Sequence, residues 1–162
     1  SDTYSSGIYQ TFATEAKAKG LDVVAAEAFT ADNKTDFSVQ IQKAKDAGAE
    51  LVFLPIYYQE ASLILAQANK AGFAPKWFGC DGMDGILDLD GFDASLAEDL
   101  MFLTPFTANA TDEATQKFVA DYKEAFGDTP IQFAADAYDA VYAVKAAAEK
   151  EEEFASAALF FL

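Results

Sequence analysis

The sequence contains no histidine and no arginine, and its single cysteine is Cys80. All 11 basic residues are therefore lysines, set against 27 acidic residues, and the formal net charge is −16. Without histidine, neither histidine-dependent catalysis nor a histidine metal site can form. So acidic a chain would be repelled by nucleic acids and by anionic membrane surfaces, because both attract basic faces. We therefore expect no nucleic-acid partner.

Longer patterns are also missing. No apolar run reaches the roughly 18 residues that a membrane-spanning helix needs. Neither a P-loop nor a Gly-x-Gly-x-x-Gly pattern occurs, so no nucleotide cofactor is expected, and we predict no other cofactor. Residues 1–7 lack an initiator Met and the charged and apolar stretches of a signal segment, so we interpret the sequence as either a processed form or a piece of a longer chain. The 162 residues, 52% of them apolar, suffice for one domain.

Two features invite a chemical interpretation. Five aspartates lie between residues 81 and 93, but their spacing is not that of an EF-hand, because Phe92 occupies a ligand position and no Glu closes the loop. We interpret this segment as an acidic surface loop and predict no metal site. Cys80 lies beside acidic residues that would not favour its thiolate, so we interpret it as a small buried residue rather than a nucleophile.

Apolar periodicity and glycine breakers predict alternating helices and strands. Three predicted helices each end at a glycine, and an apolar strand follows each of them. The helices are expected over 8–19, 37–47 and 60–71, with Asp36 capping the second, and the strands over 23–29, 51–54, 77–78 and 100–103. This rhythm predicts an α/β fold with a doubly wound, open parallel sheet of Rossmann-like or flavodoxin-like type and helices on both faces. The strand that should precede the first helix is missing.

The pattern changes after Pro105. Two helices are predicted in succession, over 112–126 and 133–150. Residues 151–162 form an acidic and then strongly apolar tail, whose large side chains should pack against another surface. We therefore divide the chain into an α/β core over 1–105, a helical segment over 106–150 and a tail over 151–162.

Three predicted loops meet at one edge of the sheet. Ligands of open parallel sheets bind outside the carboxyl ends of the strands, where loops 3–7, 56–60 and 81–83 lie. These loops carry the candidate ligand-binding residues Tyr4, Tyr57, Tyr58, Asp81 and Gly82. Aromatic faces and one carboxylate suit an ammonium group. An equally weighted alternative makes the tyrosines rim residues and Asp81 a helix cap.

Four segments together resemble one known family. They are residues 36–38 (DFS), 53–61 (FLPIYYQEA), 79–82 (GCDG) and 135–141 (ADAYDAV). Over residues 1–150 the chain resembles type I periplasmic binding proteins, specifically the substrate-binding subunits of branched-chain amino acid ABC transporters. That family traps its ligand between two hinged lobes. The resemblance implies that residues 1–105 form most of the second lobe and that residues 106–150 cross back to the first.

The resemblance also implies roles for single residues. Tyr4 and either Tyr57 or its neighbour Tyr58 would line the ligand site, and Asp81 would receive the amino group where the family often has Glu. The implied function is non-enzymatic binding of an amino acid outside the bacterial cytoplasm, with an ABC permease as partner. A ligand-sensing domain of a receptor or transcription regulator is the alternative. Self-association is expected through the open sheet edge or the tail.

Overall fold

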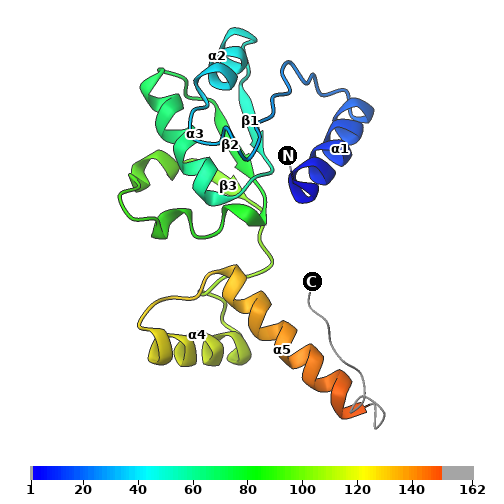
Figure 1. Ribbon diagram of the computed structural model, residues 1–162, viewed down its shortest axis with the longest axis vertical. Coiled ribbons are helices and arrows are strands. Elements are labelled where there is room, and N and C mark those ends of the chain that lie inside the picture. Colours follow the sequence, from blue (N-terminus) through cyan, green and yellow to red (C-terminus); the bar gives the residue numbers. More distant parts are fainter. Residues whose placement is uncertain (1, 151–162) are drawn as a thin grey trace. The chain divides into compact units, whose positions relative to one another are not determined.

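The computed structural model describes residues 2–150, and the chain divides into two compact units, Ser1–Pro105 and Phe106–Leu162 (Figure 1). Each unit is described by itself. The first contains α1 (Thr3–Ala18), α2 (Ser38–Asp46), β1 (Leu51–Leu54), α3 (Tyr58–Lys70), β2 (Lys76–Gly79), β3 (Leu100–Phe102) and the short 3-10 helices η1 (Asp81–Met83), η2 (Ile86–Asp88) and η3 (Ala94–Ala97). The second contains α4 (Glu113–Phe126) and α5 (Gln132–Lys150).

The three strands of the first unit form one parallel sheet in the order β1-β2-β3. Val52 pairs with Trp77, and Trp77 pairs with Leu100, so one row of large apolar side chains crosses the sheet. Parallel neighbours need crossover connections, and α3 supplies the one between β1 and β2. The predicted α/β fold with a parallel sheet is confirmed, and so are the strands predicted at 51–54, 77–78 and 100–103. The second extends one residue further at each end, and the third is shorter by one residue.

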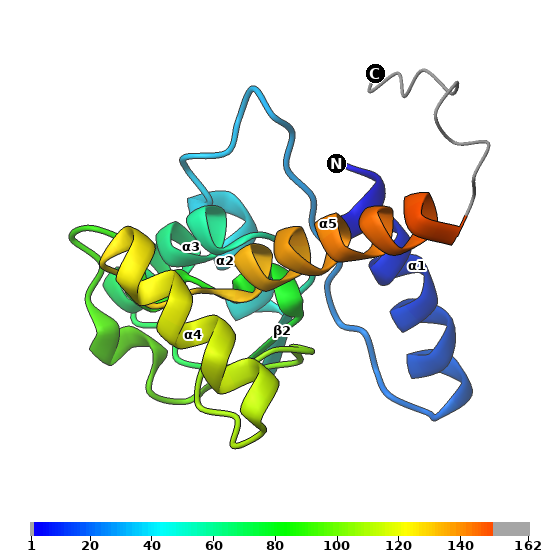
Figure 2. The same ribbon diagram turned by 90° about the horizontal axis from the view of Figure 1, so that it is seen from below.

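Helices lie on both faces of the sheet. Alternate strand residues point to opposite faces, and Leu54 and Trp77 are buried in one core with α2 and α3. On the other face Phe12 of α1 stacks on Phe53 of β1, with ring centroids 4.4 Å apart. Figures 1 and 2 show α1 on one side of the sheet and α2 and α3 on the other. This arrangement agrees with the predicted doubly wound sheet.

The glycine stops are confirmed. Gly20, Gly48 and Gly72 follow the first three helices with φ of 72°, 70° and 62°. This left-handed conformation lets backbone N–H groups close the last helical turn, and it favours glycine because no Cβ obstructs it. Asp36 was expected to cap α2, and its carboxylate accepts the Ser38 N–H at 3.0 Å.

Four predictions for the first unit are wrong. The third helix begins at Tyr58 rather than residue 60, so residues 58–60 of the predicted loop 56–60 are helical, and the predicted loop 81–83 is the 3-10 helix η1. Residues 23–29, expected as a strand, have no regular secondary structure and pair with no strand of the described chain, and Val23 and Val24 are 41% and 46% exposed. In a flavodoxin-like order the second strand pairs only with the first, and residues 2–150 hold no strand before α1. The first helix, expected over 8–19, begins at Thr3, because the Asp2 carboxylate caps it. Residues 3–7 are therefore helical rather than a loop.

The second unit is a helix pair, and the predicted helices over 112–126 and 133–150 are confirmed. Asp112 caps α4 by accepting the Thr115 N–H at 2.8 Å. Phe118 of α4 contacts Tyr138 of α5, with ring centroids 4.8 Å apart. No helix within residues 2–150 is long and apolar enough to cross a bilayer. The predicted tail, 151–162, lies outside the described residues.

Candidate functional site

Tyr4 stands in the first turn of α1. Asp2 fixes the start of this helix by accepting the Ser5 N–H at 2.7 Å and the Ser5 hydroxyl at 3.2 Å. Satisfying an otherwise unpaired N–H in this way stabilises a helix terminus by about 1 kcal/mol. The cap sets where the first turn begins, and therefore where Tyr4 projects.

Asp81 and Gly82 come from η1, directly after β2. The Tyr4 hydroxyl donates to Asp81 Oδ1 at 2.7 Å. The same hydroxyl accepts the backbone N–H of Gly82 at 3.0 Å. Residues separated by 77 positions in the chain are thus joined at the carboxyl edge of the sheet. The structure brings these three predicted residues together.

The two neighbouring tyrosines after β1 have different environments. Tyr57 precedes α3, its ring stacks on that of Tyr4 with centroids 5.0 Å apart and planes 27° apart, and it is 37% exposed. Tyr58 is instead half-buried and packs against the main hydrophobic core. Tyr57 therefore joins the candidate site, whereas Tyr58 contributes to the core of the unit.

Gly82 lies where nothing larger fits. A Cβ at this position would lie 2.7 Å from the carbonyl oxygen of Ile56 and 3.0 Å from the Tyr4 hydroxyl. The backbone of η1 thus packs directly on the segment that leaves β1. Because the Ile56 carbonyl is backbone rather than a flexible side-chain end, this close approach requires glycine.

The electrostatics of the site follow from burial and from one negative charge. Burial raises the pKa of the Tyr4 phenol well above its ordinary value, and the hydrogen bond to Asp81 raises it further. Burial also raises the pKa of the Cys80 thiol, and the charge of Asp81 adds to the effect. Cys80 is 9% exposed and therefore sits as a protonated thiol in the core, as the sequence indicated. Neither group is poised for nucleophilic chemistry at neutral pH.

The acidic segment 81–93 has local structural roles. Asp93 accepts the backbone N–H and the hydroxyl of Ser95, at 3.0 Å and 2.7 Å, and so begins η3. Within residues 2–150, no three acidic or cysteine side chains gather closely enough to hold a metal ion.

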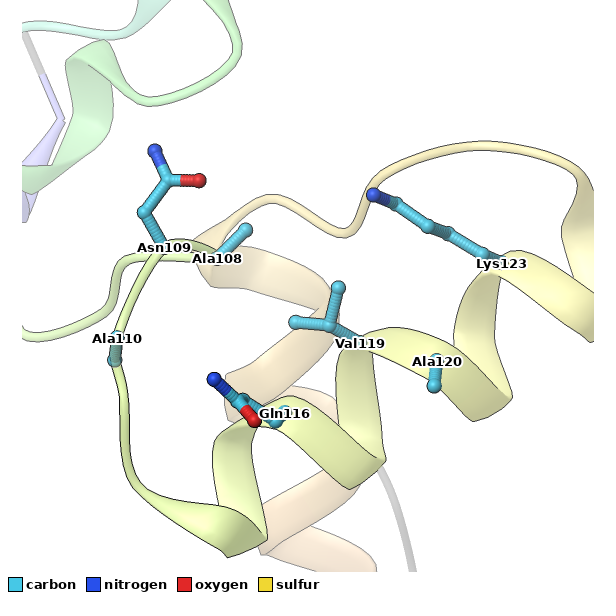
Figure 3. A pocket seen from close by; sticks show the side chains of 7 residues that line it. All are labelled: Ala108, Asn109, Ala110, Gln116, Val119, Ala120 and Lys123. Carbon is cyan, nitrogen blue, oxygen red and sulfur yellow. The ribbon is translucent and has the colours of Figure 1, made fainter.

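Two grooves lie away from the tyrosine and aspartate cluster. One, of about 420 Å³, belongs to the second unit, where α4 residues Val119 and Lys123 face the preceding loop (Figure 3). Its lining offers two amides and one ammonium group among alanines. The other, of about 570 Å³, lies between α1 and residues 20–26. Neither groove combines a carboxylate with an aromatic pair as the cluster at Asp81 does.

Sequence reasoning missed two contributors to the site. The first is Asp2, whose role was signalled by an acidic residue three positions before Ser5, a spacing typical of a helix N-cap. The second is the Ile56 carbonyl that abuts Gly82, for which the sequence carries no signal because the contact is between backbone atoms of separate segments.

Known proteins resemble this chain over most of its length. A Leu/Ile/Val-binding protein homolog of Brucella abortus is 29% identical over 133 residues, 79% of this chain and 33% of the relative. The leucine-, isoleucine-, valine-, threonine-, and alanine-binding protein of Pseudomonas aeruginosa is 27% identical over 93% of this chain and 39% of its own length. The chain thus spans between a third and two fifths of these relatives.

Solved structures give the same result. A leucine-binding protein of Thermotoga maritima is 28% identical, with a TM-score of 0.77 over 92% of this chain and 42% of that one. The branched-chain amino acid transporter substrate-binding protein of Streptococcus pneumoniae, solved with isoleucine, is 28% identical, with a TM-score of 0.80 over 93% of this chain and 42% of that one. The family profile for periplasmic binding proteins matches residues 2–159. The chain therefore belongs to the periplasmic binding protein family.

Proposed function

We propose that the protein binds an amino acid without transforming it, as the substrate-binding component of an ABC transporter. The observation that carries the proposal is the meeting of Tyr4, Tyr57 and Asp81 at the carboxyl edge of the sheet. The names of the relatives, and the isoleucine bound to one solved neighbour, agree with an amino acid ligand.

In this proposal Asp81 receives the ammonium group of the ligand. A carboxylate has about four acceptor positions, and the Tyr4 hydroxyl occupies one of them on Oδ1. The half-exposed ring of Tyr57 adds an electron-rich face on which a cation or an aliphatic side chain can rest. These 162 residues contain no arginine, so they offer no guanidinium group to the carboxylate of the ligand.

The remaining parts of the proposal concern location and partners. Family membership supports a location outside the bacterial cytoplasm, and transport requires an ABC permease as partner. We also expect the 162-residue chain to self-associate, because the outer edge of β1 carries no paired strand in the described residues and Leu51 on it is 49% exposed.

A ligand panel tests the proposal. A ligand that binds only the folded state raises the melting temperature, by an amount that grows with its concentration. The complete gene product should be heated with each of the twenty amino acids, and we expect stabilisation by at least one apolar amino acid. Asp81→Asn should abolish the shift, whereas Asp88→Asn, at an exposed position in η2, should preserve it. If no amino acid stabilises the wild-type protein, the proposal is wrong.

A further inference from the structure

The Tyr4 hydroxyl is already engaged within the protein. A phenol has one proton to donate, and here it goes to Asp81 Oδ1 at 2.7 Å. Its oxygen also accepts the Gly82 N–H at 3.0 Å. A ligand that took the donor proton would have to break the bond to Asp81 first. The role of this tyrosine is therefore different from that of a residue whose hydroxyl faces the ligand.

From this geometry we infer that Tyr4 is a positioning residue, which fixes the carboxylate of Asp81 in the orientation that receives an ammonium group. The inference rests on the proposed function, since it concerns the same site. It separates the site into two roles. Asp81 and Tyr57 contact the ligand, whereas the Tyr4 hydroxyl acts only through Asp81.

The surroundings of the hydroxyl leave it little freedom to turn away. Its oxygen lies against Gly82, at a point where a Cβ would be only 3.0 Å from it. The ring is held from the side by its stack with Tyr57, and the backbone is held by the N-cap at Asp2. Three elements, α1, η1 and the start of α3, thus converge on one phenol. Within the first unit, this tyrosine links the helix on one face of the sheet to the loop that bears the acid.

The physical benefit is preorganisation. An aspartate side chain on a short 3-10 helix can adopt several rotamers. A ligand that binds only one of them binds more weakly, because fixing the side chain costs conformational entropy. A hydrogen bond from a neutral donor to a charged acceptor is stronger than one between neutral groups, so Tyr4 can hold a single orientation before the ligand arrives. Loss of the hydroxyl should therefore weaken binding about tenfold, through Asp81 alone.

The first experiment needs no ligand. Amide hydrogen exchange of the 162-residue chain, followed by NMR, should show faster exchange at Gly82 in Tyr4→Phe, by about tenfold, because its acceptor is gone. The Met83 amide, which donates to the Cys80 carbonyl at 3.0 Å, serves as the internal control and should not change. Tyr57→Phe keeps the ring stack and should leave both amides as they are. Unchanged exchange at Gly82 in Tyr4→Phe would overturn the inference.

The second experiment is a double-mutant cycle on the complete gene product, with isoleucine as the probe and calorimetry as the readout. Tyr4→Phe should weaken binding about tenfold in the wild-type background and by less than about twofold when Asp81 is already Asn. Equal weakening in both backgrounds would show that Tyr4 contacts the ligand directly, and the positioning role would be wrong. A wild-type protein that binds no amino acid would overturn the proposed function, and the positioning role with it, even if exchange at Gly82 responds as expected.

Discussion

The side chain of Gln67 on α3 joins the segment before α2 to the core by two hydrogen bonds. Its Oε1 accepts the backbone N–H of Phe37 at 2.7 Å, and its Nε2 donates to the carbonyl of Thr35 at 2.9 Å. Phe37 is only 1% exposed, so its N–H depends on this partner rather than on water. One amide therefore fixes the path by which the chain enters α2.

This contact predicts a stability effect. Gln67→Ala removes the partner of a buried N–H and should lower the free energy of unfolding by about 1–3 kcal/mol. Urea unfolding can be followed through Trp77, the single tryptophan, which is buried. Gln42→Ala on α2, whose side chain only reaches Asp46 one turn along, is the matched control and should change little. Equal effects of the two substitutions would contradict the prediction.

Much of the first unit was predictable because its signals are local. The glycines after the helices, the continuous apolar run of β1 and the aspartate before α2 each act within a few residues. Segment 23–29 was mispredicted because its apolar pattern is that of a strand. A strand needs a neighbour to pair with, and residues 2–150 supply none for this segment. Strand pairing depends on the whole sheet, and the apolar periodicity of one segment does not show whether a partner strand lies beside it.

The candidate site was predictable in its members but not in its connections. Topology alone placed Tyr4, Tyr57 and Asp81 at one edge, since parallel strands end together. The sequence did not distinguish Tyr57 from Tyr58, because adjacent residues at the start of a helix point in different directions and only packing decides which faces the core. It also did not reveal that the Tyr4 hydroxyl bonds to Asp81 rather than facing outward.

Helix caps predict an acid-sensitive fold. Hydrogen bonds from backbone N–H groups lower the pKa of Asp2 and of Asp112 below the ordinary value for aspartate. A carboxyl whose pKa is lowered by folding stabilises the fold fully above its unfolded pKa, near 3.8, and that contribution is lost as the pH falls through the folded pKa. We therefore expect helical content, measured by circular dichroism, to fall below about pH 4.

A substitution at Asp112 measures how much of the acid sensitivity comes from the cap of α4. Asn at position 112 can still accept the Thr115 N–H but does not ionise in this range. Asp112→Asn should therefore make α4 less sensitive to acid. Glu124→Gln, in the body of the same helix, controls for the loss of one negative charge. If Asp112→Asn and wild type lose helicity along the same acid curve, the cap is not the cause.

The thiol of Cys80 should be unreactive in the folded protein. Burial raises its pKa and the neighbouring charge of Asp81 adds to the effect, so both access and thiolate fraction are low. With a chromogenic disulfide reagent at pH 8, labelling should be about a hundredfold slower or more than in guanidinium chloride. Asp81→Asn removes the smaller cause and should leave labelling slow. Fast labelling of the native chain would show that this part of the core opens readily.

Self-association of the 162-residue chain should depend on the open side of its sheet. Light scattering across a concentration series is expected to show species larger than the monomer, because β1 is an edge strand of the described sheet and segment 23–29 carries exposed valines. Val24→Lys should reduce association, since a charge discourages edge pairing, whereas Val144→Lys on α5, at a similarly exposed position of 52% against 46%, should not. A monomer at every concentration would refute the prediction.

Two glycines in opposite surroundings should respond to alanine in opposite ways. At Gly82 a Cβ would lie 2.7 Å from the Ile56 carbonyl oxygen, so Gly82→Ala must displace η1 and break the bond to Tyr4. We expect it to cost about 1–3 kcal/mol of unfolding free energy and to weaken amino acid binding. Gly7 lies inside α1 with open space around it, and Gly7→Ala should instead stabilise the chain by about 0.5–1 kcal/mol. Both values come from urea unfolding followed through Trp77. A Gly82→Ala protein as stable as Gly7→Ala would mean that η1 can withdraw from Ile56 at little cost, and the close packing on which the site depends would not be a constraint.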